Sequence, residues 1–181
     1  MNMSALSILY IVLPFVGVFA LHEVEEILTA PRWAGKCREK HLNMPKALQP
    51  IACRYLEADK KDLWVTALEQ LLLLVVITVF LLNGGRLSNL CWMMAFCAYS
   101  VHVLVTIGLA VAQKGYFPGL VTALLSLPFV CYGLYSISLV QSWGRIVLCA
   151  ITGTALVFTN LMIVDSLLTK IMSKDGDEYH R

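Results

Sequence analysis

Long apolar runs are the feature of this sequence that most restricts its fold. The run WVTALEQLLLLVVITVFLL fills positions 64–82, and about 20 mostly apolar residues let a helix cross the hydrocarbon core of a bilayer. Hydrophobic residues make up 59% of the chain and charged residues 14%, against roughly 45–50% and about 25% in soluble domains. We therefore expect an all-α integral membrane protein, a bundle of five transmembrane helices with spans at about residues 5–24, 64–82, 87–112, 118–140 and 146–171.

One transmembrane domain over residues 1–172 accounts for nearly the whole chain. Short connections join the last four runs, which predicts antiparallel neighbours. The connection of residues 27–63 is longer and carries eight of the 14 Lys and Arg residues, so we expect a cytoplasmic loop there. The tail SKDGDEYHR, residues 173–181, is mixed in charge and is expected to be disordered.

The distribution of Lys and Arg predicts the orientation of the bundle. With five spans, one side receives residues 27–63, Lys114 and the C-terminal end, which carry twelve Lys and Arg, whereas the other side receives Arg86 and Arg145. Positive residues in short loops stay in the cytoplasm, so the N-terminus is expected outside and the C-terminus inside, in the plasma membrane of a bacterium. No Lys or Arg precedes the first run, which favours an uncleaved helix over a signal peptide.

Ionisable side chains end or interrupt four of the runs, and the alternating topology puts them all in the cytoplasmic half of the membrane. Charges there cost about 2.5–3.5 kcal/mol each on insertion scales and usually face the bundle interior, paired or functional. A solvated helix end would explain the stretch FALHEVEEIL of residues 19–28 by itself, but not the groups within later runs. The six residues are His22, Glu25, Glu26, Glu69, His102 and Asp165.

Three motifs in order resemble those of the HXXEE-domain integral membrane proteins. They are HEVEE at 22–26, AYSVH at 98–102, which provides the His of the family's N-x-x-x-H, and YFPGLVT at 116–122, which fits Y-x-P-G-x-x-T. Ala98 stands where the family has Asn, so any role of that Asn is missing here. The resemblance covers about residues 5–125 and implies a membrane fold without an established chemistry.

Imidazoles and carboxylates without a thiolate suit zinc or non-haem iron. The candidate ligands for one or two such ions are His22, Glu25, Glu26, Glu69 and His102. Ferritin-like di-metal bundles use Glu-x-x-His on two helices, whereas the order here is His-x-x-Glu and His102 has no carboxylate one turn away. A single ion with an open position is therefore the more economical hypothesis, and Glu69, which resembles an acidic residue early in the family's second span, is expected to act as general base.

The motif YFPGLVT predicts a sharp turn that opens the fourth helix, because Pro118 fixes its φ angle and Gly119 permits close approach of another backbone. Thr122 would then lie one turn into the helix, level with Glu69, and Tyr116 would reach the site as a hydrogen-bond donor or proton relay. We expect Glu69, Tyr116 and Thr122 to take part in catalysis. A tight turn with an interfacial tyrosine explains the same residues without catalysis.

These residues favour a metal-dependent membrane enzyme, a hydrolase acting on a lipid or other small apolar substrate that enters from the cytoplasmic leaflet, with iron-dependent oxidation as second choice. A metal-free acid–base isomerase, a small proton- or cation-coupled transporter and a structural subunit stay open as alternatives. The net charge of +2 is too small to indicate a nucleic-acid partner, so none is expected. Without a nucleotide-binding motif no organic cofactor is expected either. The small residues of GTALVFTN in the fifth run would suit packing within one bundle or in a homo-oligomer.

Overall fold

The computed structural model describes residues 8–38, 55–56 and 60–178, and helices form nearly all of this part of the chain. A π-helical turn precedes five α-helices, and no strand occurs among these residues. The elements are η1 (Ile8–Val12), α2 (Leu13–Arg38), α4 (Lys60–Leu82), α5 (Arg86–Gln113), α6 (Leu120–Ser138) and α7 (Trp143–Glu178). The all-α prediction is confirmed.

Four of the helices are long and apolar enough to cross a membrane, which makes the chain a multi-pass membrane protein. They are α4, α5, α6 and the part Trp143–Leu167 of α7. The helix α2 is not among them, because HEVEE and the basic residues after it lower the apolar character of its described part. Residues 5–7 of the first predicted span lie outside the described residues.

Two helices extend past the ends predicted from the sequence. The helix α2 continues to Arg38, through Pro31, where a loop was expected from residue 27. Pro31 removes one backbone N–H from the helix, but Trp33 and Ala34 are buried directly after it, and this packing holds the chain helical. Similarly, α7 continues to Glu178 instead of ending before residue 173, since adding residues to an existing long helix is favourable.

Parts of those two predicted segments lie outside the described residues. In the predicted cytoplasmic loop these are residues 39–54 and 57–59, and in the predicted tail they are residues 179–181. The bounds predicted for these two segments are therefore tested only at the ends of α2 and α7.

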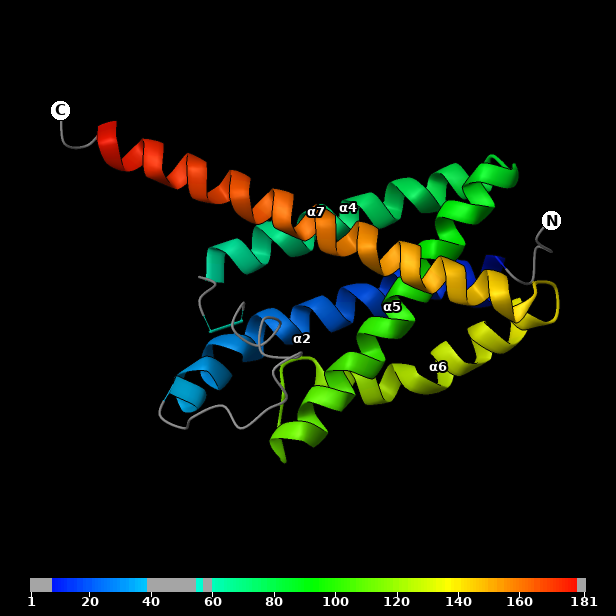
Figure 1. Cartoon of the computed structure of the whole chain (residues 1–181), viewed down its shortest axis with the longest axis horizontal. Coiled ribbons are helices and arrows are strands. Elements are labelled where there is room, and N and C mark those ends of the chain that lie inside the picture. The colour runs from blue at the N-terminus through cyan, green and yellow to red at the C-terminus, as the bar shows by residue number, and fades with distance from the viewer. Residues whose placement is uncertain (1–7, 39–54, 57–59, 179–181) are drawn as a thin grey trace.

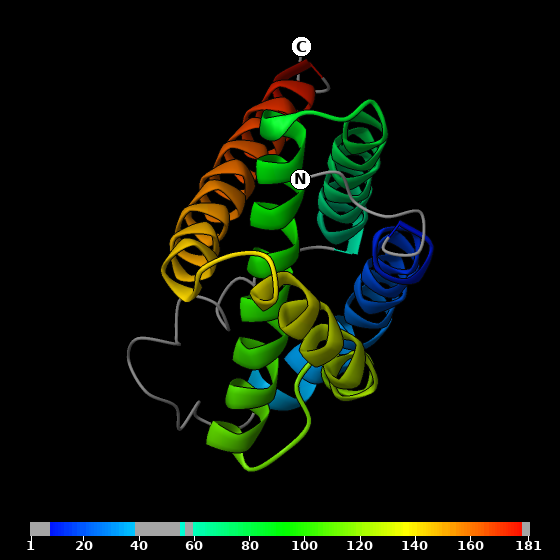
Figure 2. The ribbon, with the colours of Figure 1, turned by 90° about the vertical axis from the view of Figure 1, so that its right-hand side faces the viewer.

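Successive α-helices run in opposite directions, and α5 crosses the others obliquely (Figure 1). Figure 2 shows α5 in the middle, with α7 on one side and α2 and α4 on the other. It packs against α4, α6 and α7, while α2 packs against α4 and α6. The 28 residues of α5 span about 42 Å at 1.5 Å per residue, more than the roughly 30 Å of a hydrocarbon core. A tilted crossing accommodates this length.

Aromatic rings hold α2 against α5 and α6 on the side of the core next to HEVEE. Phe15 of α2 packs edge-on against Trp92 and Phe96 of α5, with ring centroids 5.9 and 5.1 Å away. The Phe96 ring fits only because position 133 of α6 is glycine, since a Cβ at Gly133 would overlap it. These contacts bring the face of α2 that bears His22 next to α5.

The contact between α5 and α7 predicts a specific sensitivity at Gly153. A Cβ there would overlap the carbonyl oxygen of Met94, so we expect Gly153→Ala to lower the free energy of unfolding by about 1–3 kcal/mol, as overpacking does. Gly144→Ala is the matched control on the same helix, because nothing lies within 4 Å of a Cβ at that position. Thermal unfolding in mild detergent, followed by circular dichroism, compares the two variants. Equal stability would contradict the close approach of α5 and α7.

Candidate metal centre

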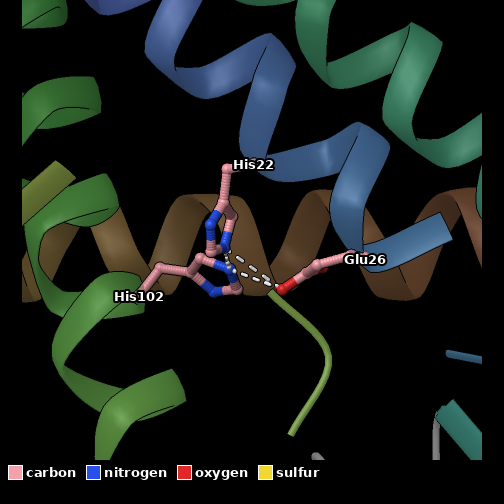
Figure 3. A group of neighbouring side chains, drawn as sticks. All are labelled: His22, Glu26 and His102. Carbon is pink, nitrogen blue, oxygen red and sulfur yellow. Dashed lines mark hydrogen bonds and ion pairs between the residues drawn. The ribbon is translucent and has the colours of Figure 1, made fainter. Parts of the chain in front are cut away.

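Three side chains from two helices point their donor atoms at one another (Figure 3). His22 and Glu26 lie one turn apart on the same face of α2, and His102 comes from α5. The Nε2 atoms of the two imidazoles are 2.9 Å apart, and Glu26 Oε1 lies 3.2 Å from His22 Nε2 and 3.1 Å from His102 Nε2. Within residues 8–38, 55–56 and 60–178, this is the one group of three or more His, Cys, Asp or Glu side chains arranged to hold a metal ion.

The group is buried on the α2 side, and His102 of α5 is its most exposed member. The His22 side chain is fully buried and that of Glu26 is 8% exposed, whereas 37% of the His102 side chain is exposed. Tyr99 closes the buried side by packing its ring edge-on against His22, with centroids 5.8 Å apart.

Glu25 points away from this group and caps the N-terminus of α6. Its Oε1 accepts hydrogen bonds from the Tyr116 hydroxyl at 2.5 Å and the Val121 N–H at 3.1 Å, and its Oε2 accepts from the N–H and the hydroxyl of Thr122, both at 2.6 Å. The first N–H groups of a helix have no partner within the helix, and the N-cap residue Gly119 has no side chain to provide one. A carboxylate from α2 takes that place, and it is well suited to the positive end of the helix dipole.

Thr122 determines which nitrogen of His22 carries a proton. Its hydroxyl lies 2.6 Å from Glu25 Oε2 and 3.1 Å from the Gly119 carbonyl oxygen, which are both acceptors. The single hydroxyl proton goes to one of them, so Thr122 Oγ1 has to accept a hydrogen bond from His22 Nδ1, 2.9 Å away. A neutral His22 then keeps its lone pair on Nε2, the atom that faces the other two donors.

The second oxygen of Glu26 has its own partner, Tyr55. The Tyr55 hydroxyl donates to Glu26 Oε2 at 2.7 Å, from the connection between α2 and α4. The Tyr55 ring packs edge-on against Phe117, with centroids 5.4 Å apart. Nothing in the sequence separates this tyrosine from an ordinary interfacial one, since its partner lies 29 residues earlier in the chain.

The Pro118–Gly119 turn opens α6, as the sequence pattern predicts, and it lies against the side chains of the group instead of another backbone. Gly119 has a φ angle of 79°, and a Cβ there would lie 2.8 Å from His22 Cε1 and 2.9 Å from Glu26 Cγ. Only glycine combines this backbone conformation with this approach. Position 119 therefore sets how near the start of α6 comes to the imidazole and the carboxylate.

Tyr116 lies at the edge of the site, half-exposed, in the turn between α5 and α6. Partial burial and the hydrogen bond to Glu25 raise the pKa of Tyr116 to about 12. The phenol is thus protonated at neutral pH and remains a hydrogen-bond donor. Its position beside Glu25 is compatible with the predicted role of a donor, but its contact is to the cap of α6 and not to the three converging atoms.

Two carboxylates that the sequence predicts at the depth of His22 and His102 lie outside the group of three donors. Both oxygens of Glu69 on α4 accept from Asn160 Nδ2 of α7, at 3.1 and 2.9 Å. This is a polar link between two membrane helices, and Glu69 is not in the converging group. Asp165, also on α7, is not in that group either.

The three donors fit a divalent metal ion. Ligand atoms 2.0–2.1 Å from a tetrahedral zinc ion lie about 3.3 Å apart, close to the observed 2.9–3.2 Å. The lone pair of His22 Nε2 faces Glu26 Oε1, which also carries lone pairs. Two such acceptor atoms repel each other unless a cation or a proton lies between them. Two imidazoles and one carboxylate form ligand sets of both zinc and non-haem iron, and hydrogen bonds to the outer atoms of ligands, as on His22 and Glu26, are typical of such sites.

The fold and this site define an all-helical membrane protein whose HEVEE stretch lies at a helix junction with converging imidazole and carboxylate donors. Residues 13–133 match a family model described as "Protein of unknown function with HXXEE motif". The match covers more than half of the chain, which therefore belongs to the HXXEE family, as its motifs predicted. It includes the three donors and their partners Tyr55 and Thr122 but ends before α7. No curated protein and no solved structure matches the chain.

The closeness of the turn to the site predicts a large effect of Gly119→Ala. Alanine at a left-handed φ costs about 1–2 kcal/mol, and crowding against His22 and Glu26 adds about 1–3 kcal/mol. Gly84→Ala measures the cost of the left-handed φ alone, because Gly84 has nearly the same φ of 77° and no atom lies within 4 Å of a Cβ at that position. Unfolding in detergent should show Gly119→Ala to be the less stable variant, and equal losses would argue against the close approach.

The hydrogen bond between Thr122 and His22 predicts that two substitutions of Thr122 differ in their effect on the free energy of unfolding. Thr122→Val leaves the buried His22 Nδ1–H without an acceptor, which should lower the free energy of unfolding by about 1–3 kcal/mol. Thr122→Ser keeps the hydroxyl and should recover most of that loss. Nitrogen NMR of labelled imidazoles would report the tautomer directly, with one protonated Nδ1 expected at His22 in the wild type and the Ser variant. An unchanged spectrum in Thr122→Val would refute the assigned tautomer.

Proposed function

We propose that this protein is a membrane metalloenzyme that holds one zinc or iron ion with His22, Glu26 and His102. The observation that carries the proposal is the convergence of three donor atoms within 2.9–3.2 Å of one another. Two of the ligands are oriented from behind, His22 by Thr122 and Glu26 by Tyr55. Such support fixes ligand geometry before an ion arrives.

Hydrolysis is the first choice of reaction. A divalent ion with three protein ligands and an open position polarises a carbonyl or phosphoryl oxygen and activates water. The protein's own residues hold the ligands and exclude solvent on the α2 side. The half-exposed Tyr116 would donate its one hydroxyl proton to a substrate oxygen only in place of Glu25 Oε1, its present acceptor. The same ligand set with iron would favour oxygen-dependent oxidation, so the identity of the metal decides between the two reactions.

A lipid or another small apolar molecule is the substrate that suits this location. Thr122 and Gly119 put the site at the start of α6, a helix of 19 residues that spans about 28 Å, close to a hydrocarbon core. The site thus lies near a membrane boundary, where a polar head group and water both arrive. The exposed side of His102 would be the entrance.

We also propose a topology of five spans, with α2 as the first, the N-terminus outside and the C-terminus in the cytoplasm of a bacterium. Exposed cations gather at the end of the bundle where α2 and α5 finish and α4 begins, and they include Arg32, Lys36 and Lys114. Arg86 and Arg145 lie at the opposite end. This asymmetry favours the first end as cytoplasmic.

Metal content tests the proposal. Protein purified in mild detergent without added metal or a histidine tag should contain about one equivalent of zinc or iron by mass spectrometry, because three ligands suffice for a catalytic site. Glu26→Gln and His102→Ala should lose the ion, whereas Glu69→Gln should keep it, since Glu69 pairs with Asn160 outside the group. A folded wild type without stoichiometric metal would refute the proposal and favour metal-free proton chemistry at the same residues.

A further inference from the structure

The two oxygens of Glu26 lie in different surroundings. Oε1 faces His22 and His102 at 3.2 and 3.1 Å. Oε2 accepts the hydroxyl proton of Tyr55 at 2.7 Å. One oxygen is thus turned toward the other two donors, and the other is held by a phenol.

Tyr55 is held in place by the turn that covers the site. Its ring packs edge-on against Phe117, which is 1% exposed. Phe117 also packs edge-on against Trp33 of α2, with ring centroids 5.0 Å apart and an interplanar angle of 69°. These rings form one apolar cluster with Leu109 of α5. The position of the Tyr55 hydroxyl is therefore fixed by α2, α5 and the turn before α6 together.

We propose that Tyr55 is a positioning residue that keeps Glu26 a one-oxygen ligand, and so keeps a coordination position free for substrate. This inference rests on the proposed metal centre. Carboxylates bind cations through one oxygen or through both. The hydrogen bond from Tyr55 keeps Glu26 Oε2 from binding the ion. Without that bond, Oε2 is free to turn toward the ion and fill the position that the substrate needs.

Neighbouring carboxylates do not take over this function. Glu25 already accepts four hydrogen bonds at the start of α6, and Glu69 is paired with Asn160. The binding mode of Glu26 therefore decides how many positions on the ion the protein occupies. A single hydroxyl group on Tyr55 controls that mode.

The test uses the full-length protein in mild detergent with Co²⁺ as the probe. Tyr55→Phe removes the hydroxyl and keeps the ring on Phe117, and Tyr135→Phe is the matched control, because Tyr135 is exposed on α6. We expect the wild type and Tyr135→Phe to bind one Co²⁺ with the same affinity and visible d–d spectrum. Tyr55→Phe should also bind one Co²⁺, but its d–d bands should weaken as the coordination number rises, because the freed Glu26 Oε2 becomes a further ligand atom.

Each outcome decides a separate question. If Tyr55→Phe and the wild type give the same d–d spectrum, the role of Tyr55 is wrong while the metal centre stands. If a folded wild type binds no Co²⁺, the metal centre itself is refuted. Infrared difference spectra of the wild type with and without Co²⁺, assigned through Glu26→Gln, need no change at Tyr55. Carboxylate bands with the narrow separation of a two-oxygen ligand would overturn the inference even if Tyr55→Phe does not fold.

Discussion

The hydrogen bonds from the first turn of α6 to the Glu25 carboxylate are the interaction on which the site depends. In an apolar surrounding, the N–H groups of Val121 and Thr122 would otherwise lack acceptors, and such groups are costly to leave unpaired. Gly119 brings this turn against α2 and has no side chain to cap the helix. Glu25 therefore both completes α6 and fixes the distance between the two helices. That distance in turn places the Thr122 hydroxyl on His22.

Adjacent glutamates have different tasks because successive residues of a helix point about 100° apart. Glu25 faces α6, and Glu26 faces His102 of α5. Both oxygens of each carboxylate have a contact. Polar networks in a low-dielectric interior are strong when every member is satisfied. Glu25 thus acts on the His22 imidazole through the Thr122 hydroxyl, and Glu26 contacts that imidazole directly.

Depth in the membrane could be calculated from the sequence, but lateral position could not. Helix rise gives the level of a residue from the end of its run, and His22, Glu26 and His102 do meet as their levels suggest. Glu69 is also at a suitable level, yet it faces Asn160 of α7. Nothing in a single helix says which neighbour a given face will meet. The same limit applies to Tyr55, whose segment shows no apolar periodicity that would place it against the site.

The sequence by itself determined the all-helical membrane class, most of the helix bounds, the HXXEE family and the His22–Glu26 face, because hydrophobicity and helical periodicity act between near neighbours. Only the tertiary structure decided which glutamate joins the donors and which caps α6, since the contacts that distinguish Glu26 from Glu25 join residues 76 and 97 positions apart. Those contacts follow from how closely the helices approach at glycines such as Gly119 and Gly133. Helix approach is a property of packed surfaces, and no local pattern encodes it.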